Sequence, residues 1–182
     1  MKISEKDSDK YFELFFPLLD YANRKYSVIR ELRKVCFEAH VPSQYLRKIT
    51  DSLWADNTEP AEYLRQYGDT LSEEDRSIIE GFSKRICGDF ILLKHLPKGT
   101  VFIAKDHKVY IVKGLKDTWE ELLFFKEPPA FVNMTILPFK GQLITDGIPS
   151  VSQEFMPLEL ERKMNSIYLQ AKKNKEIITS IG

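Results

Sequence analysis

The sequence predicts an α+β fold with three parts, and the spacing of its apolar residues is the observation that predicts it. Up to about residue 87 the apolar residues recur at helical spacing. Short runs of β-branched and aromatic residues, separated by turn signals, then continue to about residue 152, after which helical spacing returns. We therefore expect a helical subdomain over residues 1–87, an antiparallel β-meander or small partly open barrel over residues 88–152, and a closing helix over residues 153–182 that packs back on the body.

The helical subdomain begins with a helix that Ser8 can cap and that we expect to break near Pro17, because proline lacks a backbone N–H. A second helix is expected over residues 27–40. Its apolar residues fall on one helical face, namely Val28, Ile29, Leu32, Val35, Cys36 and Ala39. Pro42 can open the next helix, and a short helix is expected after Pro60.

Turn and capping signals divide the rest of the chain. Thr70 and Glu73 form a capping-box pattern before one more helix, which we expect Gly88 to end. Strands are then expected over residues 90–96, 100–104, 108–112, 130–137 and 142–148. A second capping box, Thr118 with Glu121, precedes a brief predicted helix over residues 122–125.

The last predicted hairpin contains two residues that constrain its backbone. Pro138 is expected to interrupt the strand ladder, because proline cannot donate a hydrogen bond to it. Gly141 is expected to supply an unusual backbone angle at the corner. Beyond Pro157, a terminal amphipathic helix is predicted, with apolar residues Leu160, Met164, Ile167, Tyr168 and Ala171 on one face.

The charges cancel over the whole chain but not locally. Lys and Arg number 27 and Asp and Glu number 27, so no net field favours nucleic acid or an anionic membrane. Residues 24–48 hold seven basic and two acidic groups, whereas residues 51–80 hold nine acidic and two basic groups. Two blocks of opposite charge this close are expected to complement each other within the helical subdomain, although a functional basic face is the alternative.

Cysteine content and the amino terminus indicate the compartment. Cys36 and Cys87 have no C-x-x-C neighbour, which favours free thiols in a reducing cytosol, although a single bridge between them stays an alternative. The segment MKISEKDSDK is highly charged, and no apolar stretch approaches the length of a membrane helix. We therefore expect a cytoplasmic protein with no membrane partner.

One segment has the spacing of a helix-turn-helix, over residues 28–54. Its second helix would expose Arg47 and Lys48 to phosphates and base edges. Against a DNA-binding role, His40 stands where such motifs prefer glycine, and the following residues are acidic. A plain helical hairpin is the favoured interpretation.

Signatures of catalysis, cofactors and metals are absent from the sequence. It contains no G-x-S-x-G, H-E-x-x-H, G-x-x-x-x-G-K or G-x-G-x-x-G pattern. Cys36 and His40 have a spacing that can place two ligands toward a metal, but each is better explained by helix packing. We expect no cofactor and no metal, and we expect that the protein is not an enzyme.

The final hairpin is the strongest local candidate for a binding site. Phe139, Lys140 and Asp146 lie beside glycines at the two ends of a short strand, where they can line one edge. The competing interpretation is structural, because Asp before Gly is an ordinary turn signal and a lysine at a turn is normally solvated.

Several segments together resemble a group of uncharacterised bacterial proteins, common in Firmicutes, that share an LPFKGxIxxDG-type signature. The resembling segments are SLWADN, TLSEED, GDFILLKHLPKGTVFIA, KVYIVKGL and ILPFKGQLITDGI. The resemblance extends approximately from Leu53 to the carboxy-terminal tail. It implies no activity, cofactor or catalytic residue, and Thr145 departs from the aromatic residue that the signature commonly has there.

These observations lead us to expect a non-catalytic cytoplasmic module that binds an unidentified protein partner. A small sheet with one solvated face and a helical partner suits recognition. Nucleic-acid binding, through residues 28–54 or the β subdomain, is the first alternative. An enzyme with a site near Lys140 and Asp146 is the second.

Overall fold

The computed structural model describes residues 1–123 and 126–181 and has the predicted α+β fold. The chain divides into two compact units. The helical unit comprises residues 5–84, and the sheet unit comprises Met1–Ser4 together with the chain from Arg85 onward. No helix in the described residues is long and apolar enough to cross a membrane.

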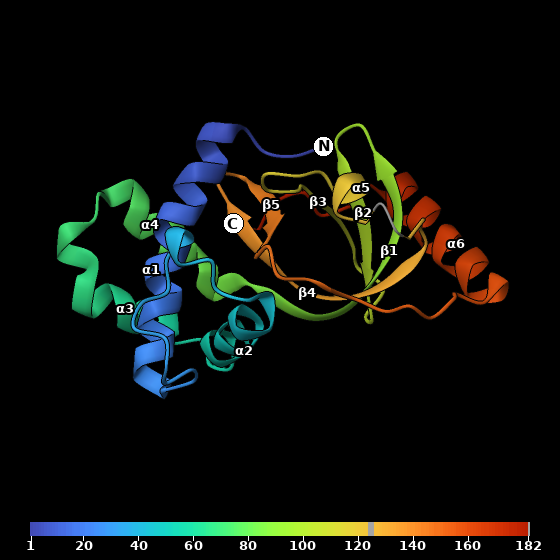
Figure 1. The fold of residues 1–182 in the computed structure, drawn as a ribbon. Helices are drawn as coiled ribbons and strands as arrows, with labels where there is room; N and C mark the ends of the chain where they lie inside the picture. Colours follow the sequence, from blue (N-terminus) through green and yellow to red (C-terminus); the bar gives the residue numbers. More distant parts are fainter. Residues whose placement is uncertain (124–125, 182) are drawn as a thin grey trace. The chain divides into compact units, whose positions relative to one another are not determined.

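The helical unit contains four α-helices and three short 3-10 turns (Figure 1). In chain order they are α1 (Glu5–Tyr26), η1 (Phe37–Ala39), α2 (Ser43–Trp54), α3 (Glu59–Tyr67), η2 (Gly68–Thr70), α4 (Glu73–Gly81) and η3 (Phe82–Lys84). Its centre is aromatic: the Phe15 ring stacks on Tyr11 and on Trp54, with centroids 5.0 and 6.1 Å apart. Phe82 meets Trp54 edge-on. Aromatic rings bury much surface, so they can organise a small helical core.

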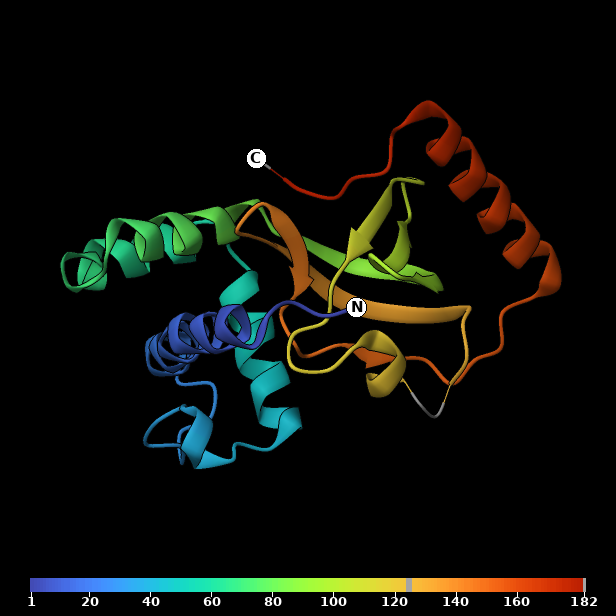
Figure 2. The same ribbon diagram turned by 90° about the horizontal axis from the view of Figure 1, so that it is seen from above.

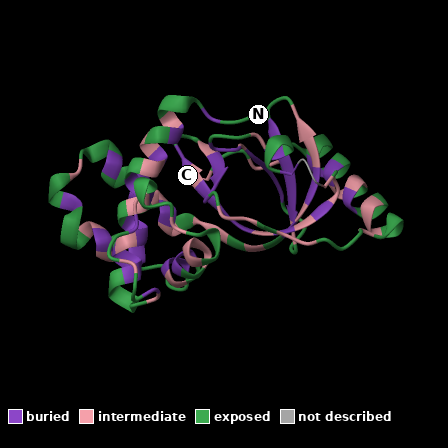
Figure 3. Ribbon diagram, viewed as in Figure 1, coloured by how far each residue is buried: buried purple, intermediate pink, exposed green. Residues whose placement is uncertain are grey.

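The predicted break at Pro17 is wrong, since α1 runs through it without interruption. Proline removes one intrahelical hydrogen bond. The helix nevertheless buries a continuous apolar face around this position, with Leu14, Phe15, Leu18 and Leu19 all at most 3% exposed. Figure 3 shows the buried and exposed sides along α1. Burial of this face offsets the loss of one backbone bond.

The predicted helix over residues 27–40 is also wrong, and with it the first helix of the proposed helix-turn-helix. This segment is irregular apart from η1. Two polar side chains of α1 hold its backbone: Asn23 Oδ1 accepts from Ile29 N at 2.8 Å, and Asp20 Oδ1 accepts from Val35 N at 2.7 Å. Such side-chain bonds offer the backbone an alternative to helix. The segment still buries Ile29 and Val35.

The helix boundaries differ from prediction at three further places. Ser8 is buried inside α1 rather than capping it. Ser72, not Thr70, caps α4 by accepting from Asp75 N at 3.1 Å. Gly88 lies within a strand, because α4 and η3 have already ended before it. The helix predicted after Pro42 is confirmed, and the short helix predicted after Pro60 is present but already begins at Glu59.

The described residues of the sheet unit form six strands in one antiparallel sheet, together with helices α5 (Trp119–Leu122) and α6 (Leu158–Asn174). The strands are β1 (Ile86–Leu96), β2 (Gly99–Ala104), β3 (Val109–Val112), β4 (Ala130–Phe139), β5 (Gln142–Thr145) and β6 (Ser150–Val151). The order is β3-β2-β1-β4-β5, with β6 also pairing with β4. The sheet curls until its end strands meet, where Lys113 N donates to Leu143 O at 2.9 Å. This is the predicted partly open barrel.

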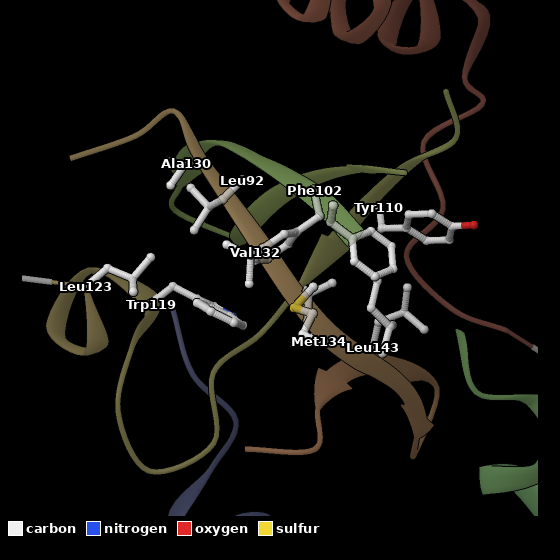
Figure 4. Packing of buried hydrophobic residues seen from close by; sticks show 12 residues of the cluster. Leu92, Phe102, Tyr110, Trp119, Leu123, Ala130, Val132, Met134 and Leu143 are labelled. Carbon is white, nitrogen blue, oxygen red and sulfur yellow. The ribbon is translucent and has the colours of Figure 1, made fainter. Parts of the chain in front are cut away.

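The two faces of the sheet bury different clusters. The inner face and α5 enclose Phe102, Trp119 and Met134, and Figure 4 shows these side chains gathered inside the curl. The Phe102 and Trp119 rings are 4.8 Å apart. The outer face packs against α6 through Met164, Tyr168 and Ala171. The helix beyond Pro157 and its inner face are therefore as the periodicity predicts.

Three local features complete the sheet unit. The Thr118–Glu121 capping box is present with both hydrogen bonds, whereas the end of the helix predicted over residues 122–125 lies outside the described residues. Pro138 does not interrupt the hairpin, because β4 continues through it in register with Leu143. Ile178, in the tail that follows α6, pairs with β3 at Tyr110. Figure 2 shows this tail, in red, between α6 and the C-terminus.

Candidate binding pocket in the helical unit

A cavity of about 300 Å³ opens in the helical unit between α1, the irregular segment and α3. The residues that line it are Phe16, Pro17, Asp20, Tyr21, Arg24, Lys34, Val35, Cys36, Tyr63 and Tyr67. The α1 members recur three or four positions apart, which places them on one face of that helix. The volume is at the lower end of the range for ligand pockets. We call this cavity the tyrosine pocket.

Three tyrosine rings form one wall of the tyrosine pocket. Tyr63 and Tyr67 are one turn apart on α3, with ring centroids separated by 5.1 Å. Tyr21 on α1 meets them edge-on, at 5.5 Å and 6.2 Å respectively. Tyr21 and Tyr63 are each 7% exposed, whereas Tyr67 is 47% exposed. The wall therefore has a fixed base and one ring that is open to solvent.

A network of charged groups joins the two helices, α1 and α3, that carry these tyrosines. Lys25 Nζ donates to Glu59 Oε1 at 2.7 Å and to Glu62 Oε2 at 2.5 Å. The Tyr26 hydroxyl also donates to Glu59 Oε1. Glu59 is only 1% exposed, so its carboxylate depends on these partners. The network joins the end of α1 to α3 and confirms that the basic and acidic blocks of the sequence complement each other at this point.

The network shifts the pKa values of several of its members. The hydrogen bonds that Lys25 donates to Glu59 and Glu62 raise its pKa above the ordinary value. The hydrogen bond from Lys25 lowers the pKa of Glu62. Bonding to Glu59 raises the pKa of Tyr26, and burial raises that of Tyr21. Lys25 and Glu62 are therefore charged near neutral pH, and Tyr21 and Tyr26 are neutral.

The opposite rim of the tyrosine pocket is basic. Asp20 lies in the lining, but its carboxylate is already bonded to Val35 N at 2.7 Å and to Arg24 Nε at 2.9 Å. The Arg24 side chain is still 64% exposed. Lys34 is exposed and forms no ion pair within the described part of the chain. The rim consequently presents positive charge to an incoming ligand.

An exposed aromatic patch continues from the tyrosine pocket through Phe16. The ring of Phe16 stacks on Phe12 at 5.8 Å and meets Phe37 edge-on at 6.0 Å. Phe37 is 54% exposed. Apolar surface that is contiguous and edged by charged groups is typical of interaction sites.

The three hairpin candidates do not form a comparable site. Phe139 is 2% exposed and packs in β4, and Asp146 is 3% exposed. Asp146 Oδ1 accepts from Ile148 N at 3.1 Å, which closes the turn after β5. Lys140 is exposed at the β4–β5 corner, with a positive φ of 47°. None of the three lines the tyrosine pocket.

The two candidates from the predicted helix-turn-helix, Arg47 and Lys48, are adjacent on α2 and precede its buried residues. Arg47 Nε pairs with Asp51 Oδ1 at 3.0 Å on the same helix. Lys48 is exposed next to it. Neither residue lines the tyrosine pocket, and the helix that should precede α2 in a helix-turn-helix is missing.

The described residues contain no group of three or more His, Cys, Asp or Glu side chains that could hold a metal ion. Cys36 and Cys87 are both free thiols. No protein-family model, curated protein or solved structure matches the chain.

The sequence contains one indication of the tyrosine pocket, but the spacing of the residues concerned is equally typical of a buried helix face. Tyr63 and Tyr67 are four residues apart, which predicts one helix face. Tyr21 joins them from α1, where its hydroxyl donates to Glu62 Oε2 at 3.5 Å and Lys25 bonds Glu59 and Glu62. The pocket therefore depends on contacts between segments that are distant in sequence.

Proposed function

We propose that this protein is a non-catalytic module that binds another protein, and that the tyrosine pocket takes a short acidic segment with one bulky apolar anchor. The observation that carries the proposal is the combination of the half-exposed Tyr67 ring with a basic rim. Tyrosine and arginine are enriched among the residues that dominate interface energy. Tyr67 and Arg24 supply these groups at the mouth of the pocket.

Charge complementarity selects the chemistry of the segment. Arg24 and Lys34 flank the opening, and the only lining carboxylate, that of Asp20, is bonded within the protein. An Asp or Glu side chain of the partner would meet these two cations, while its apolar anchor would contact Phe16 and Tyr67. The acidic side chains would also speed the encounter of the two proteins.

Nucleic acid is the alternative partner, and the charges of α3 argue against it at this pocket. Glu59 and Glu62 lie on α3, the helix that carries Tyr63 and Tyr67. A nucleic-acid strand carries a phosphate at every nucleotide and would extend beyond the basic rim towards these carboxylates, whereas a short peptide can place a single acidic side chain at the rim. The sequence suggests Arg47 and Lys48 on α2 as contacts to nucleic acid. Of these two, Arg47 is already paired with Asp51.

The test is a selection from a library of displayed random peptides against the full chain. We expect enriched peptides to combine Asp or Glu with a large apolar residue. A synthetic peptide of the enriched sequence should then bind the wild-type protein and lose about tenfold in affinity with Tyr67→Ala, as expected for an aromatic anchor at an interface. Lys34→Glu should weaken binding by about fivefold.

Two matched variants control for general effects. Lys48→Glu makes the same charge change on α2, outside the pocket, and Phe155→Ala removes a ring that is 94% exposed in the sheet unit. Both should bind the peptide as the wild type does. Selection of peptides without acidic residues, or equal losses in the control variants, would contradict the proposal. Tight binding of single-stranded DNA or RNA that weakens steeply with salt and with Lys48→Glu would favour the nucleic-acid alternative.

The proposal includes a cytoplasmic location in a bacterial cell and membership of the LPFKGxIxxDG group. Two free thiols support a reducing compartment. The hairpin with the sequence LPFKGQLITDG supports the group. An enzyme using Lys140 and Asp146 is not favoured, because the Asp146 carboxylate already serves its own turn.

A further inference from the structure

The sheet unit contains a second cavity, of about 250 Å³, on the outer face of the sheet. It lies under the first turns of α6, beside β1, β2 and β4. Further along the helix, Tyr168 and Ala171 close against the sheet. At the beginning of the helix Leu160 is only partly buried, as is Phe131 on β4. The helix therefore covers the sheet fully at one end and leaves an opening at the other.

The interior of this cavity is apolar. Ile91 and Ile103 form its floor, and Leu160 and Met164 form the wall on α6. A bound water needs two to four polar partners, which these side chains do not supply. The cavity is consequently better suited to an apolar chain than to solvent.

The mouth of the cavity has polar groups with an excess of positive charge. Asp89 pairs with Lys105 at 2.7 Å and accepts from Asn133 Nδ2 at 2.6 Å, so its carboxylate is occupied. Lys163, on α6, forms no ion pair among residues 1–123 and 126–181. His107 adds a ring nitrogen at the same edge. The uncompensated cation at this mouth is therefore Lys163.

We propose that this cavity binds a small amphiphilic acid, with the apolar body between α6 and the sheet and the carboxylate at Lys163. The apolar interior requires a hydrocarbon or similar body. The single lysine at the mouth requires one anionic group at its end. The size of the cavity restricts the ligand to a short or medium chain. This site lies entirely within the sheet unit and is independent of the tyrosine pocket.

The first experiment titrates the full chain with decanoate, below the concentration at which it forms micelles, and follows binding by calorimetry or by amide chemical shifts. We expect saturable binding with one site, and shifts confined to α6, β1, β2, the turn at His107 and β4 near Phe131. Decanol, which lacks the charge, should bind less tightly, and decyltrimethylammonium should bind least. An absence of saturable decanoate binding up to millimolar concentration would overturn the proposal.

Two variants with matched controls locate the site. Lys163→Gln should weaken decanoate binding by about fivefold and leave decanol unchanged, whereas Lys172→Gln, on the last turn of α6, should change neither. Leu160→Glu should reduce binding of both ligands by at least about tenfold, because it places a carboxylate in the apolar wall. Its control is Leu169→Glu, at a position on the same helix that is 61% exposed.

The variants also separate this site from non-specific binding. Equal affinity for decanoate and decanol, or affinity for decanoate that neither Lys163→Gln nor Leu160→Glu changes, would contradict the proposal. Lys163→Gln alters an exposed side chain and should leave the thermal unfolding midpoint unchanged. It therefore gives an answer even if Leu160→Glu disturbs the fold.

Discussion

The hairpin of β4 and β5 and the tyrosine pocket differ in what their polar groups do. In the hairpin, the Asp146 carboxylate accepts from the backbone of its own turn, and Phe139 is buried. In the pocket, Arg24 and Lys34 face solvent and Tyr67 exposes nearly half of its surface. The hairpin has the more recognisable sequence, yet its side chains are occupied by folding. A short sequence signature can therefore mark a backbone conformation rather than a binding site.

The largest effect should come from the buried ring of the hairpin. Phe139→Ala is expected to lower the free energy of unfolding by about 3–5 kcal/mol, since it leaves a cavity where a buried phenyl ring was. Urea denaturation measures this loss. Where the variant remains folded, its affinity for the selected peptide should equal that of the wild type. A loss of less than about 1 kcal/mol together with weakened peptide binding would make Phe139 a ligand contact instead.

The next largest effect is expected at the turn after β5. Asp146→Ala should cost about 1–3 kcal/mol, because Ile148 N then loses its acceptor inside the folded protein. Asp146→Asn keeps an acceptor oxygen and should cost clearly less. The two values come from the same denaturation experiment. If both variants were as stable as the wild type, the turn would not depend on this side chain.

A smaller, pH-dependent effect is expected from the network behind the tyrosine wall. Because Lys25 lowers the pKa of Glu62 in the folded state, this acid stabilises the fold above its unfolded pKa, and the contribution disappears as pH falls through the folded value. Glu62→Gln should therefore be less stable than the wild type at pH 7, and the difference should begin to shrink at about pH 4.5 and disappear only below the lowered folded pKa. Denaturation at a series of pH values measures it. A difference that does not change with pH would contradict this account of the wall.

The smallest effect is expected at the exposed corner of the hairpin. Lys140→Ala should change the free energy of unfolding by less than about 0.5 kcal/mol, because the side chain is exposed, and should leave peptide binding unchanged. Both quantities are measured with the variant purified beside the wild type. A marked loss of peptide affinity would instead indicate that the hairpin takes part in peptide binding.

The sheet unit follows the sequence patterns closely, and the helical unit does so less well. Alternating apolar residues predict the strands, the Thr118–Glu121 box predicts the cap of α5, although this helix spans Trp119–Leu122 and so begins before the predicted residues 122–125, and the spacing around Met164 predicts α6. These signals are local. The segment over residues 27–40 has helical spacing too, but Asn23 and Asp20 of the preceding helix bind its backbone. That outcome depends on tertiary contacts, which a periodicity analysis does not include.

The same distinction explains why the sequence draws attention to the hairpin and not to the tyrosine pocket. Lys140 and Asp146 attract attention because they stand beside glycines within ten residues of each other. The tyrosine pocket needs Tyr21 and Tyr63, which are brought to within 5.5 Å only by the packing of α1 on α3. The Lys25–Glu59 ion pair is one of the contacts between these two helices, and periodicity does not predict it.

Backbone amide mapping with the selected peptide tests the central claim most directly. Hydrogen exchange and amide chemical shifts are measured on the full chain with and without saturating peptide. We predict protection and shifts in α1 near Tyr21, in the segment around Lys34 and in α3, with residues 138–147 unchanged. Changes concentrated in residues 138–147, with the tyrosine pocket unaffected, would contradict the account and identify the hairpin as the binding site.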